Sequence, residues 1–265
     1  VENVTKSYKG PDGIDRTVVD DLYLEHRAGE TLVIVGETGT GKSTTAAIAL
    51  ALTVPDSGRV LFEGSPWSDL REKDRRPVRR RIASVSQDPL GSFDPRRNVG
   101  QLIASALRVS DRGSNDVAPR VASLLADVGL PAGLEGRHPL TLSGGQRQRV
   151  AIARALATDP DVLVLDEAVS ALDVSVQAQV LDLLADIRAA YGVASLFISH
   201  DLGVIHHVSD RVLVLKDGRV VEEGDAERVF RSPREEYTRR LIEALPRLGG
   251  ADQLGTLEQV EGGER

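Results

Sequence analysis

One stretch near the start of the chain, TLVIVGETGTGKSTTAAIALAL (residues 31–52), most constrains how the protein can fold. An apolar run is followed by a glycine-rich turn and then by an alanine-rich run. Gly36, Gly41, Lys42 and Ser43 fit the spacing G-x-x-x-x-G-K-[ST]. Glycines there let backbone N–H groups wrap a phosphate chain, and the start of a helix adds the positive end of its dipole. The stretch therefore predicts a strand, a phosphate loop and a helix; the alternative is a glycine-rich turn without a ligand.

The motif also predicts which atoms would meet a nucleotide. Lys42 can reach the β- and γ-phosphates, and the Ser43 hydroxyl can be a ligand of Mg²⁺. The residues that we expect to contact the nucleotide are Gly36, Glu37, Thr38, Gly39, Thr40, Gly41, Lys42, Ser43 and Thr44.

Two adjacent carboxylates follow a second apolar run, in DVLVLDEAVSALD (residues 161–173). Asp166 at the end of that run can hold Mg²⁺ through water beside the phosphate loop. Glu167 can orient or deprotonate an attacking water. The alternative is an exposed pair that caps a helix, and the phosphate loop elsewhere in the chain makes the magnesium interpretation the favoured one.

A second anion-binding turn is predicted at LSGGQRQR (residues 142–149), although the chain already has a complete phosphate loop. Ser143 offers a hydroxyl, and Gly144 and Gly145 offer unobstructed N–H groups at the start of a helical run. The alternative is an ordinary N-cap, a serine that begins a helix.

The order of apolar runs predicts an α/β fold. Continuous runs that suit buried parallel strands are separated by helical stretches. They lie at 31–35, 81–86, 161–166 and 194–199. Residues 16–30 and 58–64 suggest a flanking antiparallel sheet, and Asp217-Gly218 predicts a hairpin in residues 211–224. Helical spacing recurs at 99–107 and 117–130, another helix is expected after residue 199, and the glycine-rich residues 246–265 are expected to be poorly ordered.

Composition excludes several kinds of site. The 265 residues include no cysteine, which excludes disulfides, thiolate zinc sites and cysteine nucleophiles. Aromatic residues make up only 3%, so the core is expected to consist of Val, Leu, Ile and Ala, and the net charge of −7 gives no general attraction to nucleic acid. No run is apolar for long enough to span a bilayer, no secretory leader is visible, and the lack of any methionine favours a trimmed or excised segment.

The order of the phosphate loop, LSGGQ and VLVLDE, with Ser143 lying 23 positions before Asp166, resembles the nucleotide-binding domain of the ABC ATPase superfamily. The resemblance runs from Tyr8 to about Pro246. It implies a P-loop NTPase core of mostly parallel strands and flanking helices, with an antiparallel β subdomain and a helical subdomain. The implied domains are a core formed by residues 1–87 and 158–232, a helical subdomain of residues 88–157 that carries LSGGQ, and a C-terminal helix and flexible tail at 233–265.

The resemblance also implies roles for single residues. Tyr8 resembles the aromatic residue that stacks on adenine, and the alternative is an ordinary surface tyrosine. The implied catalytic residues are Lys42, Gln87, Glu167 and His200, and the implied Mg²⁺ ligands are Ser43, Gln87 and Asp166. The residues implied to act across a head-to-tail dimer, on ATP held by the partner's phosphate loop, are Ser143, Gly144, Gly145, Gln146 and Asp173.

Three positions depart from the usual family pattern: Ala168 and Val169 stand where Pro and Thr are usual, and Ser86 stands where Phe is frequent. None of these changes removes a catalytic group, so a hydrolysing site is expected. The other histidines are expected to be surface or interface residues without a role in the site; they are His26, His138, His206 and His207.

Three segments resemble the oligopeptide, dipeptide and nickel import branch of this superfamily. They are SQDPLGSFDPRRNVG, SHDLGVIHHVSDRVLVLKDGRVVEEG and SPREEYTRRLIEALP. The resemblance implies an ATPase that uses ATP and Mg²⁺ at the cytoplasmic face of the cell membrane. Its implied partners are a second ATPase domain (identical, paralogous or fused), two membrane permeases and, indirectly, an extracytoplasmic solute-binding protein.

A nucleic-acid partner is not expected. The basic run REKDRRPVRRR (residues 71–81) is interpreted as a solvated loop, because no aromatic residues interleave its charges. The rival hypothesis is a soluble ABC ATPase that acts on nucleic acid or ribosomes. Repair proteins of that kind carry coiled-coil or cysteine-rich insertions, and translation-associated ones carry two such domains.

Overall fold

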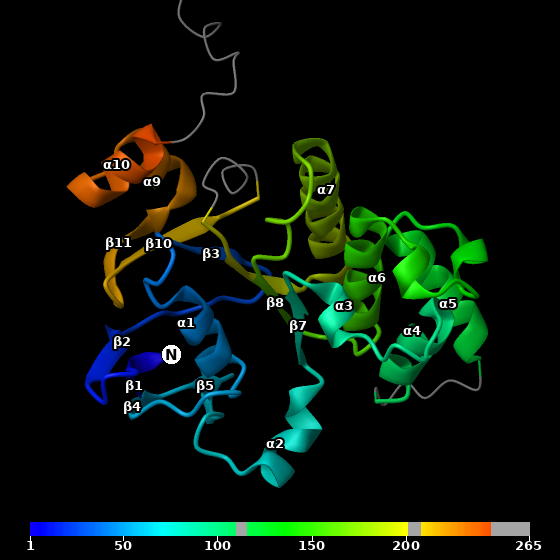
Figure 1. The fold of residues 1–265 in the computed structure, drawn as a ribbon, viewed down its shortest axis with the longest axis horizontal. Coiled ribbons are helices and arrows are strands. Elements are labelled where there is room, and N and C mark those ends of the chain that lie inside the picture. Colours follow the sequence, from blue (N-terminus) through cyan, green and yellow to red (C-terminus); the bar gives the residue numbers. More distant parts are fainter. Residues whose placement is uncertain (110–115, 201–207, 245–265) are drawn as a thin grey trace, which may run out of the picture.

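A six-stranded sheet occupies the middle of the computed structural model, which describes residues 1–109, 116–200 and 208–244 (Figure 1). Its strands are β3 (Thr31–Val35), β7 (Ile82–Ser86), β8 (Val162–Asp166), β9 (Ala194–Ile198), β10 (Arg211–Lys216) and β11 (Arg219–Asp225). The order across the sheet is β11-β10-β3-β9-β8-β7, and every pair is parallel except β10–β11. The predicted α/β fold with a mostly parallel sheet is confirmed.

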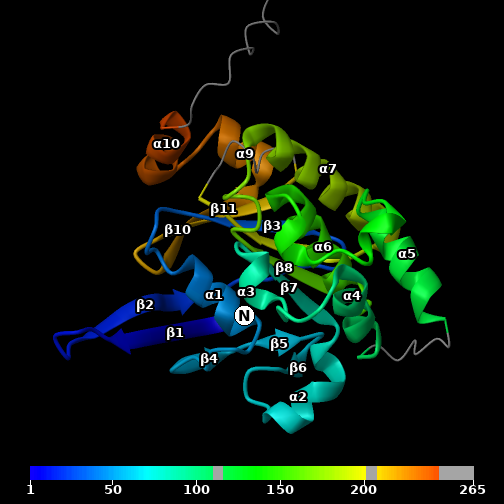
Figure 2. The same ribbon diagram turned by 45° about the vertical axis from the view of Figure 1, so that its right-hand side comes forward.

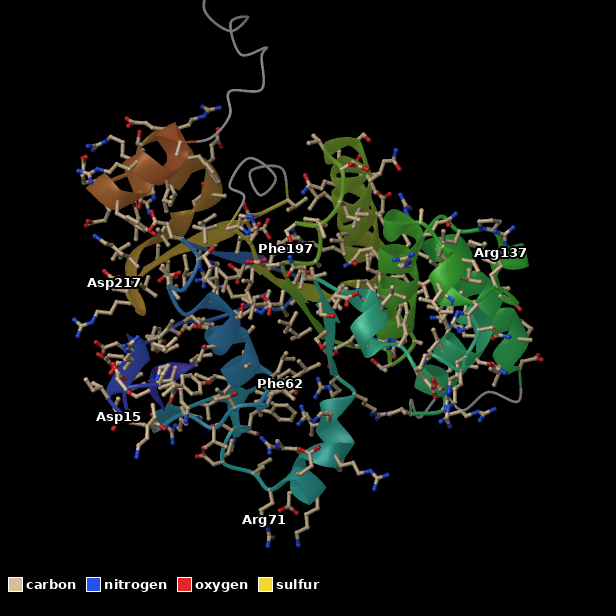
Figure 3. The ribbon with its side chains drawn as sticks, in the orientation of Figure 1. Asp15, Phe62, Arg71, Arg137, Phe197 and Asp217 are labelled. Atoms are coloured by element: carbon tan, nitrogen blue, oxygen red, sulfur yellow. The ribbon has the colours of Figure 1, made fainter. Side chains whose placement is uncertain are left out.

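The apolar runs became central strands because both faces of the sheet are covered. In β3, Val33 and Val35 join an apolar cluster with α6 (Gly144–Leu156) and α7 (Val174–Tyr191). Leu32 and Ile34 alternate with them and join a second cluster with α1 (Lys42–Ala49). In Figure 3 Phe197 of β9 lies in the middle of the molecule, whereas Asp15, Arg71, Arg137 and Asp217 mark its outer edges. A strand buried on both faces needs an unbroken apolar sequence, and this is what those runs supply.

The expected antiparallel sheet is present, and its central strand is formed by the first residues of the chain. Its order is β2-β1-β4, formed by β1 (Glu2–Lys9), β2 (Asp15–Leu22) and β4 (Ser57–Arg59). The strand expected within 16–30 ends at Leu22, and the segment 58–64 divides between β4 and β5 (Leu61–Phe62), which pairs with β6 (Ser65–Pro66). β1 pairs with both neighbours, so β2 and β4 do not pair directly.

A helical region follows β7 and lies beside the sheet, at the right of Figure 1. It comprises α3 (Pro89–Ser92), α4 (Val99–Leu107), α5 (Val117–Asp127), the short helices η1 (Ala132–Leu134) and η2 (Pro139–Thr141), and α6. The helices expected at 99–107 and 117–130 are confirmed. The three domain boundaries expected from the sequence stay predictions.

The basic run at residues 71–81 is not a solvated loop. It forms α2 (Glu72–Arg79), and the side chain of Arg75 is buried. Arg75 Nη1 donates to Ala51 O at 3.1 Å, and Arg79 Nη1 donates to Leu50 O at 2.8 Å. These carbonyls stand at the end of α1, where they have no partner within the helix and where a positive charge is favourable. The arginines therefore stabilise the helix that follows the phosphate loop.

The last described elements are the β10–β11 hairpin, α9 (Ala226–Arg231) and α10 (Glu236–Glu243). The hairpin turn expected at Asp217-Gly218 is confirmed, with both residues at positive φ. The helix expected after residue 199 falls largely on 201–207, and the tail expected at 246–265 lies wholly outside the described residues. None of the helices in the described part of the chain has the length and hydropathy needed to cross a bilayer.

Candidate functional site

The groups singled out by the sequence meet at one edge of the sheet. The loop after β3, Gln87 after β7, Asp166 at the end of β8 and His200 after β9 follow strands that lie in the order β3-β9-β8-β7. Because these strands are parallel, their carboxyl ends share an edge, which is where open α/β sheets place ligands. Residues separated by more than 150 positions in the sequence thus contribute to one site.

Two glycines of the loop lie too close to neighbouring backbone to be replaced. A β-carbon on Gly36 would lie 2.3 Å from Leu215 O of β10, and one on Gly41 would lie 2.3 Å from Val18 O of β2. Gly39 has nothing within 4 Å, but its φ of +88° favours glycine. The loop is therefore held between two strands, β10 and β2.

Helix α1 begins without an acidic cap. Its N-cap is Gly41 in the left-handed conformation, with no side chain bonded to the first N–H groups and no acid in the first turn. Lys42 is 5% exposed, and its Nζ donates to Gly36 O at 2.8 Å and to Glu37 O at 2.7 Å. Burial lowers the pKa of Lys42. Free helix N–H groups, a buried ammonium and a glycine cradle together fit a phosphate chain.

Asp166 and Ser43 form the candidate metal position. Ser43 Oγ donates to Asp166 Oδ1 at 3.2 Å. Burial raises the pKa of Asp166, and the nearby charge of Glu167 adds to the rise. No group of three acidic or histidine side chains clusters for a metal among the described residues. One carboxylate and one hydroxyl suit Mg²⁺, which takes its remaining ligands from phosphates and water.

Glu167 is held in an unusual backbone conformation beside His200. Its φ is +48°, in the left-handed region, and its N–H donates to Ile198 O at 2.9 Å. Its carboxylate oxygen Oε1 lies 3.3 Å from His200 Nδ1, and the two side chains are 24% and 49% exposed. A non-glycine residue with positive φ is costly unless its surroundings fix it. The bond to β9 fixes it here and turns the carboxylate toward the edge of the site.

Ser170 is a member of this site that the sequence interpretation did not single out. Gln87 Nε2 donates to Ser170 Oγ at 3.1 Å, and Ser170 Oγ donates to Glu167 O at 3.0 Å. Ser170 thus links two predicted catalytic residues. In the sequence, this role could have been recognised from the position of Ser170 three residues after Glu167, because a serine hydroxyl at that spacing can donate to the earlier carbonyl.

The second turn, at LSGGQ, has the helix cap that was the alternative interpretation. Ser143 is the N-cap of α6, where its Oγ accepts from Gln146 N at 3.3 Å and Gln146 Oε1 accepts from Ser143 N at 3.0 Å. A β-carbon on Gly145 would lie 2.6 Å from Cγ1 of Val176, and one on Gly144 would lie 3.5 Å from Cδ2 of Leu172. The turn is thus packed against the start of α7, and Ser143 and Gly144 are exposed.

Four further residues were singled out in the sequence. Tyr8 is 43% exposed, and Lys6 Nζ lies 5.5 Å from its ring centroid. Asp173 is the exposed N-cap of α7 and makes no side-chain capping bond. Ala168 and Val169, which depart from the family pattern, are each 2% exposed and belong to the apolar core. These two substitutions therefore fill space beneath the site without contributing a polar group.

The histidines expected at the surface behave differently from one another. His26 is half-buried, its Nε2 lies 3.0 Å from Glu30 O, and burial lowers its pKa. His138 caps η2 by accepting from Leu140 N, and its Nε2 lies 2.7 Å from Pro95 O. That these histidines are surface or interface residues without a role in the site stays a prediction. His206 and His207 lie outside the described residues.

Similarity to known proteins agrees with this geometry. The family described as ABC transporter matches residues 19–170. The oligopeptide transport ATP-binding protein OppD of Mycobacterium tuberculosis is 47% identical over 253 residues, which cover 93% of this chain and 41% of that protein. The probable peptide ABC transporter ATP-binding protein y4tS of Sinorhizobium fredii is 44% identical over 256 residues, covering 93% of this chain and 72% of that protein.

A solved structure has the same fold. The dimeric post-hydrolysis state of the ATP-binding cassette MJ0796, bound to ADP and Pi, superposes with a TM-score of 0.77 at 30% identity. The match covers 85% of this chain and 97% of that one. This chain spans about two fifths of the length of OppD.

Proposed function

This chain belongs to the ABC transporter family, and from that premise we propose that it is the ATP-binding and ATP-hydrolysing part of an importer for oligopeptides or dipeptides. The observation that carries the proposal is the meeting of the phosphate loop, Asp166, Glu167 and His200 at one sheet edge. The names of the similar proteins support peptides as the class of transported solute.

ATP would bind with its phosphates over residues 36–44. The N–H groups of the loop and of the start of α1 would surround the phosphate oxygens, and Lys42 would turn from the carbonyls of Gly36 and Glu37 to the β- and γ-phosphates. The exposed face of Tyr8 would stack on adenine. Mg²⁺, held by Ser43, Asp166 and Gln87, would neutralise phosphate charge when bound.

Hydrolysis would need a base and an orienting group, and Glu167 and His200 can supply them. The Glu167 carboxylate would take a proton from water as the water oxygen bonds to the γ-phosphorus, and ADP would leave with the electron pair of the broken P–O bond. His200 would hold the Glu167 carboxylate and stabilise charge on the γ-phosphate. Ser170 would hold the Gln87 side chain and the Glu167 backbone at a fixed distance from each other, because its hydroxyl bonds to both.

The LSGGQ turn would act on a second ATPase domain. Ser143, Gly144, Gly145 and Gln146 would cap ATP bound to the partner's phosphate loop, and Asp173 would lie at the interface. The exposure of Ser143 and Gly144 supports this assignment, as does the similarity to a cassette solved as a dimer. The partner domain would be identical, paralogous or fused.

Transport would require partners outside this chain. We propose two membrane permeases, a location at the cytoplasmic face of the membrane, and an extracytoplasmic solute-binding protein that acts indirectly. The alternative, a soluble ATPase for nucleic acid or ribosomes, has less support, because the similar proteins are named for transport and α2 uses two of its arginines to cap α1.

The test is ATP binding and phosphate release by the purified chain. The wild-type chain is expected to bind ATP and to release phosphate, and Lys42→Ala is expected to lose binding. A folded wild-type chain that binds no ATP would contradict the proposal. Activity that responds to DNA or ribosomes, but not to permeases in vesicles, would favour the alternative function.

A further inference from the structure

Helix α10 lies next to the loop that joins β3 to α1, in both ribbon views (Figures 1 and 2). The hydroxyl of Tyr237 in this helix accepts a hydrogen bond from the N–H of Glu37 at 3.2 Å. The two residues are 200 positions apart. A helix outside the sheet therefore contacts the candidate phosphate loop directly.

The contacted N–H belongs to a peptide group that is also held from its other side. Glu37 N–H and Gly36 C=O belong to the same planar unit. The Gly36 oxygen accepts from Lys42 Nζ at 2.8 Å, while the Glu37 N–H donates to Tyr237. Gly36 itself has no space for a β-carbon beside Leu215 O. One peptide plane is thus fixed by the ammonium of Lys42, by a neighbouring strand and by Tyr237.

The position of Tyr237 is determined by the core of the protein. Glu222 of β11 is 6% exposed, and its carboxylate accepts from the N–H groups of Arg234 at 3.0 Å and Glu235 at 3.1 Å, just before α10. Lys216 at the end of β10 has its Nζ 5.1 Å from the Tyr237 ring centroid. The β10–β11 hairpin therefore holds both the start of α10 and the aromatic ring.

We propose that Tyr237 is a positioning residue for the phosphate loop: it holds the Gly36–Glu37 peptide in place when Lys42 leaves that peptide's carbonyl for a phosphate. The proposal rests on the proposed binding of ATP at this loop. Tyr237 contacts the loop backbone and makes no contact with the phosphates in this account. It therefore contributes to the affinity for nucleotide and not to the chemical step.

Tyr237→Phe in the full chain removes the hydroxyl and keeps the ring beside Lys216. One neutral hydrogen bond contributes about 0.5–1.5 kcal/mol, so the Kd for ATP is expected to rise about 2- to 12-fold. The KM for ATP should rise by the same factor, and kcat at saturating ATP should stay that of the wild type. Equilibrium titration with ATP and steady-state phosphate release measure these quantities.

Tyr191→Phe is the matched control, because the Tyr191 hydroxyl also has a hydrogen-bond partner, Asp127, but that contact lies away from the loop. It is expected to leave the Kd for ATP unchanged. If the Tyr237 hydroxyl had only a structural role, both variants would lower the melting temperature and neither would change the Kd. An unchanged or lowered Kd in Tyr237→Phe would overturn the inference, whereas a wild-type chain that bound no ATP would overturn the proposed function instead.

Discussion

The turns that begin α1 and α6 both contain glycines beside a serine or threonine, but different atoms pack against those glycines. In the phosphate loop, β-carbons on Gly36 and Gly41 would strike backbone oxygens of β10 and β2, and Lys42 is buried. In the LSGGQ turn, the atoms nearest to added β-carbons on Gly144 and Gly145 belong to side chains, Leu172 just before α7 and Val176 within it, and Ser143 is exposed.

The difference indicates what each turn needs. The phosphate loop is closed by strands, by Lys42 and by Tyr237 of its own chain. The LSGGQ turn is held by its own capping box and by Leu172 and Val176 packed behind it, and Ser143 and Gly144 are exposed in the described part of the chain. We infer that the first turn binds phosphate by itself, and that the second completes a site on another domain.

The largest expected effect is a loss of the rate of ATP hydrolysis, without a loss of ATP binding, at the site beside the phosphate loop. Glu167→Gln removes the proposed base, and its rate of ATP hydrolysis should fall by roughly 10²–10⁴ while ATP binding is retained. The measurement is phosphate release together with ATP titration. Asp182→Asn, at an exposed position of α7, is the control and should keep the wild-type rate. Wild-type turnover by Glu167→Gln would contradict the assigned role.

A pair of alanine substitutions tests whether the phosphate loop tolerates a β-carbon less well than the LSGGQ turn does. Gly41 has a φ of +98° and faces Val18 O, so Gly41→Ala should cost about 1–3 kcal/mol in the free energy of unfolding. Gly144→Ala meets only an ordinary contact at 3.5 Å and should change the free energy of unfolding by less than about 0.5 kcal/mol. Denaturant titration measures both. Equal losses would show that the two turns are equally constrained.

At Gly145, a side chain of α7, and not the backbone, leaves no room for a β-carbon. Gly145→Ala is expected to cost about 1–2 kcal/mol in the free energy of unfolding, because its β-carbon would overlap Val176. Adding Val176→Ala removes the obstructing methyl groups and should restore part of that loss, when compared with Val176→Ala alone. If the double variant shows no such recovery, Val176 is not the obstacle.

A pH-dependent effect is expected at Glu222, whose carboxylate holds the start of α10 and so supports the helix beside the phosphate loop. Burial alone would raise the pKa of Glu222. Hydrogen bonds from the Arg234 N–H, the Thr238 side chain and the Glu235 N–H, together with the charge of Arg228, outweigh burial, so the pKa lies below the ordinary 4.5. A lowered pKa stabilises the fold above the unfolded value, and the gain disappears as the pH falls through the folded value. Glu222→Gln should therefore lose about 1 kcal/mol in the free energy of unfolding at pH 7, and its difference from the wild type should shrink as the pH falls through the folded pKa of Glu222. A difference that persists in acid would contradict this assignment.

The strands were predictable because burial on both faces demands unbroken apolar runs, and β3, β8 and β9 begin and end within one residue of the runs at 31–35, 161–166 and 194–199. Lys42 was predictable from the spacing of the glycine motif between β3 and α1. Asp166 and Glu167 were predictable because they stand at the end of the apolar run that forms β8 and directly after it.

The helix α2 was not predictable, because its stability comes from contacts that are distant in sequence. Arg75 and Arg79 bond to the end of α1, and their guanidinium groups lie 6.0 and 5.7 Å from the ring centroid of Trp67. Ser170 and Tyr237 were missed for a similar reason. A single hydroxyl carries no pattern in sequence, and its partners become visible only when the strands and helices are placed.

The claim that the LSGGQ turn completes the ATP site of a second domain is tested most directly by Ser143→Arg in a Glu167→Gln background. Light scattering with and without ATP measures dimer formation, and ATP titration measures binding. The Glu167→Gln chain should dimerise on adding ATP, and the double variant should bind ATP with the same Kd and stay monomeric. Loss of ATP binding in the folded double variant, or dimerisation equal to that of Glu167→Gln alone, would contradict the claim that the LSGGQ turn serves a partner's site.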